Sequence, residues 1–568
     1  MGMKIPYGLS NFATVIKEHY SYIDKTSFIR TLEDEGRHNV LLRPRRFGKS
    51  LFLSMLYYYY DINSANDFNT LFGHLAIGQN PTPKHNQYQI LFLEFSGIAI
   101  DNHESVYTAF SEKITNALLA FLEQYGYASE LHPAIIQAST PAGKIDTLLR
   151  LTQGKKIYLL IDEYDHFANA LLADDLDHFR SIMGKGGFVR AFYEAIKTGT
   201  QKGVIDRLFI TGVTPIVLDS LTSGFNVVDN LTLNPKFNEA IGFTRVETES
   251  LLKPLTQLCP LSLDSLITTV TQWYNGYHFA QEVSAMYNSD MVLYFIKRFD
   301  QRSCSYPEYM LDENIASDYG KILAMFNIGH RDDNYEVLEE LLNDGFVVAK
   351  SRRKFDFDKG FDRDDFVSLL YYMGFIAFDG NELTQQRFVI PNYVIKVLYF
   401  EYFKIEIERR NQIAISNRTI EKAVIALALY DDIEPLRLEA ERVLKALSNR
   451  DFLKFDEKHI KMLLVTLLYQ SAAYFIQSEP EINQKYPDIL LLERSPFAVK
   501  YEHLIELKFC KQSERKKHLK LWDEKREQGL AQVQSYLQLP DLKDRPKLSA
   551  WVMLTDGEEV VVEKVYRS

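Results

Sequence analysis

Residues 43–51, which read RPRRFGKSL, carry the side chains of a phosphate-binding loop. Gly48 lets the backbone pass close to a phosphate, Lys49 can reach the β- and γ-phosphate oxygens, and the Ser50 hydroxyl can bind Mg²⁺. The usual loop starts with a glycine that serves the turn, but Arg43 stands at that position here. The residues therefore predict a nucleotide site, with ATP and Mg²⁺ as its ligands, that lacks one of its usual glycines.

The neighbours of this loop suit the same prediction. Residues 40–42 are apolar and read as the end of a buried strand, and residues 51–60 read as a helix. A strand followed by a helix places backbone N–H groups and the positive end of the helix dipole at the anion. Arg45 and Arg46 would add positive charge beside the phosphates, although the alternative is that both are solvated loop residues.

Two further strand ends complete the predicted nucleotide site. An apolar run ends in Asp162 and Glu163, where the aspartate would hold the water shell of Mg²⁺ and the glutamate would polarise the attacking water. The segment DRLFITGVTP at 206–215 contains a third predicted strand that ends in Thr211, which is placed to sense the γ-phosphate or that water. For Asp162 and Glu163 the alternative is an exposed strand end that happens to be acidic, and for the whole site the alternative is a relic that no longer binds nucleotide.

A second group of residues near the C-terminus has the spacing of a metal-dependent phosphodiesterase. Asp488 opens one predicted strand, and Glu506 and Lys508 lie two residues apart on the next, so the latter two share a face. If the strands form a hairpin, two carboxylates and the Leu507 carbonyl would bind Mg²⁺ or Mn²⁺, and the lysine would orient the attacking water. An E-x-K triplet is also common on solvated strands, but here apolar residues flank it, as in a central strand.

The pattern of elements divides the chain into three predicted parts. Residues 1–245 alternate apolar runs with helical patterns, which predicts an α/β domain with a mostly parallel sheet. Residues 246–440 are chiefly helical; they include a charged loop at 351–365, then a helix, two strands and a helix near 366–400, as in a winged-helix unit. Residues 441–568 return to alternating strands and helices, which predicts a second α/β domain.

Charge and composition limit the partners. The chain is globular in composition, with 46% hydrophobic and 25% charged residues, and its net charge is -11. Binding of nucleic acid therefore needs a local basic surface. The predicted helix after the E-x-K triplet offers one, unless its basic residues are solvated and paired with neighbouring acids. The basic residues of this segment are Lys511, Arg515, Lys516, Lys517, Lys520, Lys525 and Arg526.

The sequence argues against a membrane protein and against a cysteine-bound metal site. No apolar run has the length of a membrane span, and the first residues lack the apolar segment of a signal peptide, so we expect a cytoplasmic protein. Cys259, Cys304 and Cys510 are widely spaced and form no CxxC pair. This spacing argues against a zinc site or a disulfide framework and predicts reduced thiols.

The first half of the chain resembles the AAA-ATPase-like family of bacterial and archaeal P-loop proteins. In that family the R-P-R-R lead is normal, which implies that the loop binds nucleotide without its first glycine. The resemblance also implies that Tyr22, Asp24 and Lys25 lie near the nucleotide. The matching segments are YIDKT at 22–26, RPRRFGKSL at 43–51, LLIDEYD at 159–165, FITGVTP at 209–215, SGFNVVDNLTLN at 223–234 and WYNGYHF at 273–279.

The C-terminal part resembles the PD-(D/E)XK nuclease superfamily, through PD at 487–488 and ELK at 506–508. The resemblance implies a further metal-binding acid upstream, Glu479, and a helical glutamine, Gln532, that positions the water or the lysine. Glu481 and Gln534 are the alternatives for these two roles.

Together these features predict an ATP-binding and ATP-hydrolysing protein whose nucleotide site regulates a Mg²⁺-dependent nuclease, acting on DNA or RNA in prokaryotic defence or genome conflict. The alternative is a nucleotide-switched signalling or scaffold ATPase whose nuclease-like domain binds nucleic acid or protein without cutting. A homo-oligomer formed through the ATPase domain is compatible with both.

Overall fold

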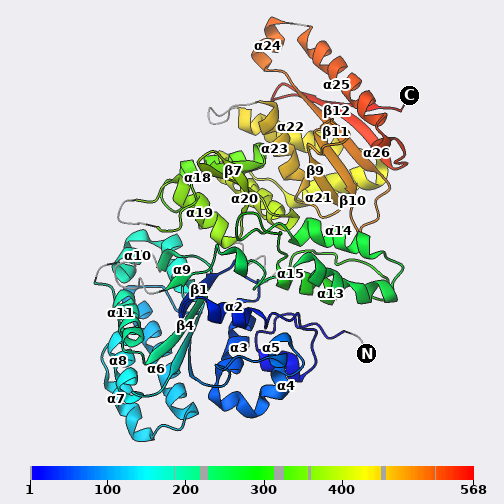
Figure 1. The fold of residues 1–568 in the computed structure, drawn as a ribbon. Coiled ribbons are helices and arrows are strands. Elements are labelled where there is room, and N and C mark those ends of the chain that lie inside the picture. The colour runs from blue at the N-terminus through cyan, green and yellow to red at the C-terminus, as the bar shows by residue number, and fades with distance from the viewer. Residues whose placement is uncertain are drawn as a thin grey trace. The chain divides into compact units, whose positions relative to one another are not determined.

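The structure, a computed structural model, describes residues 3–184, 186–217, 228–312, 325–355, 360–448, 456–518 and 520–567. The chain forms two compact units, and Figure 1 shows its ribbon coloured along the sequence. The first unit comprises Met1–Lys297, Asp312–Val337 and Phe346–Tyr393, and the second comprises Arg298–Leu311, Leu338–Gly345 and Val394–Ser568.

A five-stranded sheet forms the centre of the first unit, with strand order β2-β3-β4-β1-β5, and every neighbouring pair is parallel. Strand β4 therefore separates the strand that enters the phosphate loop, β1, from the strand that ends in the acidic pair, β3. The predicted parallel α/β domain is confirmed. The strands are β1 (His38–Leu42), β2 (Gln89–Glu94), β3 (Ile157–Asp162), β4 (Ile205–Gly212) and β5 (Asp229–Asn230).

Helices cover both faces of this sheet, because its central strands are apolar on both sides. All six residues of β3 are buried, as expected for a parallel strand between two helical layers. Helix α3 packs against β2, β3 and β4, while α6 packs on β2 and α11 on β4 (Figure 1). The helices of this region are α1 (Phe12–Lys17), α2 (Phe28–Asp34), α3 (Lys49–Tyr60), α4 (Phe68–Phe72), α5 (Ala76–Gln79), α6 (His103–Gln124), α7 (His132–Gln137), α8 (Pro141–Leu151), α9 (His166–Asp174), α10 (Leu176–Met183) and α11 (Phe188–Gln201).

The middle of the chain is chiefly helical and includes a small antiparallel sheet with strand order β6-β8-β7. Helix, strand, strand and helix follow one another near 366–400, in the predicted order. Residues 356–359 of the predicted charged loop lie outside the described residues. The elements are α13 (Arg245–Leu258), α14 (Leu263–Tyr274), α15 (Ser289–Arg298), α18 (Arg331–Asn343), β6 (Phe346–Ala349), α19 (Arg363–Met373), β7 (Ala377–Glu382), β8 (Gln385–Val389) and α20 (Tyr393–Asn411).

The second unit contains a mixed sheet with strand order β13-β12-β11-β10-β9, in which β11 and β12 are parallel and the other pairs antiparallel. Gly529 lets α25 approach this sheet, since a Cβ there would lie 2.7 Å from Val552 Cγ1. The elements are α21 (Asn417–Tyr430), α22 (Glu434–Ser448), α23 (Glu457–Leu468), β9 (Tyr474–Ser478), β10 (Ile489–Glu493), β11 (Glu502–Phe509), α24 (Gln512–Lys517), α25 (Leu521–Leu537), α26 (Pro540–Lys543), β12 (Leu548–Thr555) and β13 (Val560–Val565).

Two chain-wide features bear on the sequence predictions. Among the described residues, no helix is long and apolar enough to cross a membrane. Cys259 and Cys304 are disulfide-bonded, so the expectation of reduced thiols is wrong for these two residues. Cys510 is a free, buried thiol.

Candidate functional site

The phosphate loop joins β1 to α3, as its sequence predicts. Gly48 is the N-cap residue of α3 and has a left-handed backbone with φ 96°, which a side chain would disfavour. Helix α3 starts at Lys49 and has 12 residues, so its first N–H groups and its dipole face the loop. This backbone arrangement is the one that binds a phosphate at a helix N-terminus.

Arg43, at the position of the missing glycine, is buried and forms part of the fold. Its guanidinium donates to the carbonyls of Leu42 at 2.8 Å, Thr232 at 3.0 Å and Phe237 at 2.7 Å. It also lies 4.1 Å from the centre of the Phe279 ring. Burial lowers the pKa of Arg43 to about 9, so the group remains charged at neutral pH. The arginine thus fixes the start of the loop by bonds to distant backbone.

A cavity of about 440 Å³ opens beside the loop. Its polar wall includes both predicted loop arginines and the acid after β3, and its apolar wall comes from segments far away in the sequence. The polar wall includes Arg45, Arg46, Gly48, Lys49, Ser50 and Glu163. The apolar wall includes Ile23, Ile241, Phe243 and Leu293. A cavity with phosphate-binding groups on one side and apolar groups on the other suits a nucleotide.

Lys49 points back along the loop. Its Nζ donates to the Pro44 carbonyl at 3.0 Å, and the side chain is buried. Burial lowers the pKa of Lys49, while the nearby carboxylates of Asp162 and Glu163 raise it. The two carboxylates therefore favour the charged form of Lys49, which is the form that would bind a phosphate.

Ser50 and Asp162 meet at the ends of α3 and β3. The Ser50 side chain hydrogen-bonds to the Asp162 carboxylate, which also accepts the Glu163 N–H at 2.9 Å. Burial raises the pKa of Asp162. A hydroxyl beside a buried carboxylate is a donor set that fits Mg²⁺. Glu163 is half-buried with φ 47°, and it lines both the loop cavity and a second cavity of about 590 Å³.

The structure does not bring Thr211 to the cavity. Its side chain is fully buried, and its hydroxyl donates to the Leu41 carbonyl at 2.8 Å, which ties β4 to β1. Asp165, which the sequence did not single out, makes more hydrogen bonds at this strand end than Thr211 does. Its carboxylate accepts the N–H groups of Val213 at 3.0 Å and Thr214 at 2.6 Å. Its place as the third acid of the D-E-Y-D run at 162–165 was the local signal for this residue.

Residues 22–25 have mixed surroundings. Tyr22 and Lys25 line the loop cavity, as the family resemblance implies. The Lys25 ammonium is already bonded to the Glu247 carboxylate at 2.7 Å. Asp24 is not part of the lining, and its carboxylate accepts the N–H groups of Thr26 at 2.8 Å and Ala76 at 2.7 Å. Its observed contacts therefore stabilise the local backbone.

The start of α15 also holds the phosphate loop. Ser289 Oγ donates to the Phe47 carbonyl at 2.8 Å, and the Asp290 N–H donates to the Arg46 carbonyl at 3.2 Å. Both residues line the cavity. They lie more than 230 positions after the loop in the sequence, so no local pattern could have assigned them to it.

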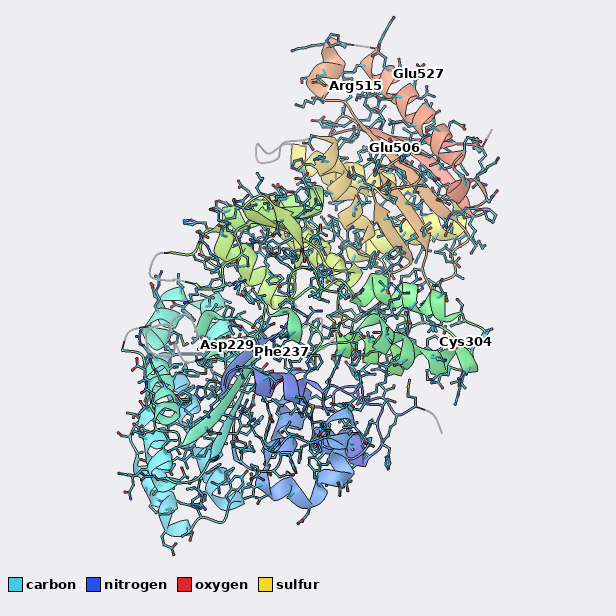
Figure 2. The ribbon with its side chains drawn as sticks, in the orientation of Figure 1. Asp229, Phe237, Cys304, Glu506, Arg515 and Glu527 are labelled. Carbon is cyan, nitrogen blue, oxygen red and sulfur yellow. The ribbon has the colours of Figure 1, made fainter. Side chains whose placement is uncertain are left out.

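The second predicted site forms on β10 and β11, which pair as the predicted hairpin with Ile489 opposite Ile505. Asp488 Oδ2 accepts the Leu507 N–H at 2.8 Å. Lys508 Nζ donates to Glu506 Oε1 at 2.7 Å and to the Leu507 carbonyl at 2.9 Å. Figure 2 labels Glu506 within the strands of the second unit. The fold therefore brings together the three side chains that the sequence singled out.

The electrostatics of this site favour a cation. Glu506 is 3% exposed, and its Oε2 has no hydrogen-bond partner in the described part of the chain. Burial and the Glu506 carboxylate raise the pKa of Asp488 to about 7. A buried carboxylate oxygen without a donor, beside a second carboxylate, fits a hard divalent cation. Nevertheless, no three His, Cys, Asp or Glu side chains among the described residues form a group able to hold a metal ion.

Glu479 and Gln532, the two residues that the superfamily resemblance implies, come from different segments of the chain. The Glu479 N–H donates to the Asp488 carbonyl at 3.0 Å, and its carboxylate pairs with Lys461 of α23. Gln532 lies on α25, and its Oε1 is buried with no partner among the described residues. Of the alternatives, Glu481 is exposed, and Gln534 donates to the Tyr566 carbonyl at 2.8 Å.

The geometry agrees with two family matches. Residues 6–222 match the family model described as a predicted AAA-ATPase, and residues 455–565 match that of the PD-(D/E)XK nuclease superfamily. The chain carries an AAA-ATPase-like domain and a PD-(D/E)XK domain. Residues 223–227, part of a segment that carried the first resemblance, lie outside the described residues.

Two individual proteins are also similar. An uncharacterised protein from the vnfD 5′ region of Azotobacter chroococcum mcd 1 is 28% identical over 299 residues, which is 52% of each chain. This chain thus spans about half the length of that curated relative. A Walker-type ATPase of Pyrococcus abyssi superposes with a TM-score of 0.36 and 11% identity, covering 66% of this chain and 94% of that one.

The basic segment beside the PD-(D/E)XK domain's sheet is partly neutralised. Arg515 pairs with Asp556 and Glu559, both at 2.7 Å, and lies 3.7 Å from the centre of the Trp522 ring. Arg526 pairs with Glu563 at 2.5 Å. Figure 2 shows Arg515 and Glu527 near α24 and α25. These two arginines thus follow the alternative of mixed pairs. Several lysines of the segment remain exposed, namely Lys511, Lys516, Lys517 and Lys520.

Proposed function

We propose that the AAA-ATPase-like domain binds and hydrolyses ATP with Mg²⁺, and that its nucleotide state controls a Mg²⁺- or Mn²⁺-dependent nuclease in the PD-(D/E)XK domain. The observation that carries the proposal is the convergence of Asp488, Glu506 and Lys508 around a buried carboxylate oxygen without a donor. A central strand bears the cost of such charges when they serve a site. The substrate class is DNA or RNA, and the proposed compartment is the cytoplasm.

In the ATPase domain each residue has one proposed task. The N-terminus of α3 and Lys49 bind the phosphates, with Arg45 and Arg46 adding charge at the cavity wall. Ser50 and Asp162 would hold Mg²⁺, which neutralises phosphate charge when bound. Glu163 lines both cavities at this point, so it is the group placed to accept a proton from the attacking water.

In the nuclease domain the two carboxylates would hold a divalent cation, which stabilises charge on the scissile phosphate. Lys508 lies against Glu506 and the Leu507 carbonyl, so its ammonium can orient the water that attacks the phosphodiester. Gln532 offers a buried amide oxygen to the same water or lysine. A role in prokaryotic defence and a homo-oligomer formed through the ATPase domain remain predictions.

A nucleotide-switched scaffold that binds nucleic acid or protein without cutting is the second candidate. The absence of a group of three metal-binding side chains among the described residues favours it.

The test is to incubate the purified full chain with single- and double-stranded DNA and RNA, with and without ATP, in Mg²⁺ or Mn²⁺. We expect cleavage that Asp488→Ala abolishes while ATP hydrolysis continues. Glu481→Gln is the matched control, since it removes an exposed acid near the site. Binding without cleavage under every condition would support the scaffold and rule out the nuclease.

A further inference from the structure

Lys461 is a second lysine at the PD-(D/E)XK centre, and neither the motif nor the family match assigns it a task. It lies on α23, which packs against β9 and β11. Its ammonium pairs with the carboxylate of Glu479, the acid whose backbone N–H donates to the Asp488 carbonyl at 3.0 Å. The charge of Lys461 also acts on the Asp488 carboxyl, where it offsets part of the rise in pKa that burial and Glu506 cause.

Lys461 is more deeply buried than a lysine in an ordinary surface ion pair. The Lys461 side chain is 8% exposed, whereas the side chain of its partner Glu479 is 50% exposed. A buried ammonium costs desolvation energy unless its donors are used. An ammonium has three donors, and the described residues provide one acceptor for it, Glu479 Oε1. Two of its donors therefore have no acceptor among the described residues.

The charges around the centre define what Lys461 can bind. Asp488, Glu506 and Glu479 supply three acids, and Lys508 and Lys461 supply two cations. A divalent cation placed among the acids repels both lysines and competes with Lys461 for Glu479. A phosphodiester anion, in contrast, is attracted by Lys461. The same ammonium therefore opposes the metal and favours the substrate.

We propose that Lys461 is a phosphate-binding residue of the nuclease centre, whose ammonium bonds to Glu479 or to a phosphate oxygen of the nucleic acid. This inference rests on the proposed function of the site. It makes Glu479 a shared partner: in the described structure its carboxylate pairs with Lys461 and forms no three-acid group with Asp488 and Glu506, and it becomes free to bind the divalent cation when Lys461 bonds to a phosphate. Substitution of the two partners then has opposite effects on metal binding.

The test measures two affinities in the full chain. Mn²⁺ binding is measured by calorimetry without nucleic acid. The heat that is present in the wild type and absent in Asp488→Ala is assigned to this site. Binding of fluorescein-labelled duplex DNA and single-stranded RNA is followed by anisotropy in Ca²⁺. We expect Lys461→Met to bind Mn²⁺ about threefold or more tightly and nucleic acid about tenfold more weakly, because one positive charge is lost. Glu479→Gln should bind Mn²⁺ about threefold or more weakly.

Lys458→Met is the matched control, because it removes a lysine from the same helix whose side chain is 61% exposed and pairs with Asp344. It should change Mn²⁺ affinity by less than about twofold. If Lys461→Met binds nucleic acid within about twofold of the wild type, as Lys458→Met should, the ion pair is only structural, and that result overturns the inference. The thermal midpoints of Lys461→Met and of a second variant, Lys461→Gln, show whether either substitution impairs folding. Both variants remove the charge, so a correctly folded Lys461→Gln tests the same prediction. A wild-type chain that binds no Mn²⁺ refutes the proposed metal site itself, and the inference with it.

Discussion

Arg43 stands at the position of the usual first glycine, and its contacts fix the start of the loop. Three carbonyls accept its guanidinium, and one aromatic ring lies beside it. Arg43→Gly would restore the usual loop sequence but leave these buried carbonyls without a donor, which costs about 2–4 kcal/mol of stability. We expect a lower thermal midpoint in calorimetry. Arg45→Gly, at a half-buried loop position, should weaken ATP binding and leave the midpoint nearly unchanged.

We expect substitutions of Lys49 and Glu163 to separate nucleotide binding from hydrolysis. Lys49→Ala removes the cation that reaches the terminal phosphates, so ATP affinity should fall by about tenfold or more. Glu163→Gln keeps the size of the side chain but removes the proton acceptor, so binding should persist while hydrolysis stops. Calorimetry with Mg²⁺-ATP and a phosphate-release assay measure the two effects. Wild-type affinity in Lys49→Ala would contradict the assignment of the site.

Asp488 gives the metal-free protein a specific pH dependence. Its pKa in the folded chain is raised to about 7 from an ordinary value near 4, so the folded state favours the protonated form. The stability this provides is complete below about pH 4 and is lost as pH rises through about 7. In chelator, the wild type should therefore lose about 1–3 kcal/mol relative to Asp488→Asn between pH 5 and pH 8.

Denaturant midpoints of both proteins at the two pH values measure this difference. Glu481→Gln removes an exposed acid and should follow the wild type. A constant difference between the wild type and Asp488→Asn across this range would mean that the Asp488 carboxyl titrates normally.

Helix α19 reaches the phosphate loop through a glycine. Gly374, which ends α19, has φ 81°, and a Cβ there would lie 2.7 Å from the Pro44 Cβ. Gly374→Ala should therefore shift Pro44 and weaken ATP binding beyond the effect of backbone strain alone. Gly126→Ala is the matched control, because Gly126 also has a positive φ, 67°, but no atom within 4 Å of an added Cβ. Equal ATP affinities in the two variants would show that α19 and the loop are independent.

The sequence predicted those parts of the sites that follow from local geometry. The two-residue period of a strand placed Glu506 and Lys508 on one face, and the apolar run of β3 placed Asp162 at its end. Thr211 suited a strand end equally well, but its hydroxyl bonds to β1, since a buried hydroxyl bonds to the nearest free carbonyl. Ser289 comes from a helix far from the loop in sequence, and Lys461 comes from the helix before β9; in both cases the tertiary fold brings the side chain to its site.

At the scale of the whole molecule, an AAA-ATPase-like domain and a PD-(D/E)XK domain share one chain. Nucleotide can control cutting only if it binds two states of the protein with different affinity, because equal binding shifts no equilibrium. Coupling therefore predicts that cutting and ATP hydrolysis can be lost independently. Asp488→Ala or Lys508→Ala should abolish cutting and spare ATP hydrolysis, whereas Lys49→Ala should change the control of cutting without altering the residues that hold the metal.

The most direct test of this account is the cleavage rate of the full chain on labelled DNA and RNA at fixed Mn²⁺, measured without nucleotide, with ADP, with ATP and with a non-hydrolysable ATP analogue. The account predicts that the wild-type rate changes by about fivefold or more between nucleotide states, which corresponds to a coupling free energy of about 1 kcal/mol. It also predicts a constant rate in Lys49→Ala. A wild-type rate that is the same in every nucleotide state, or no cleavage in any of them, would contradict it.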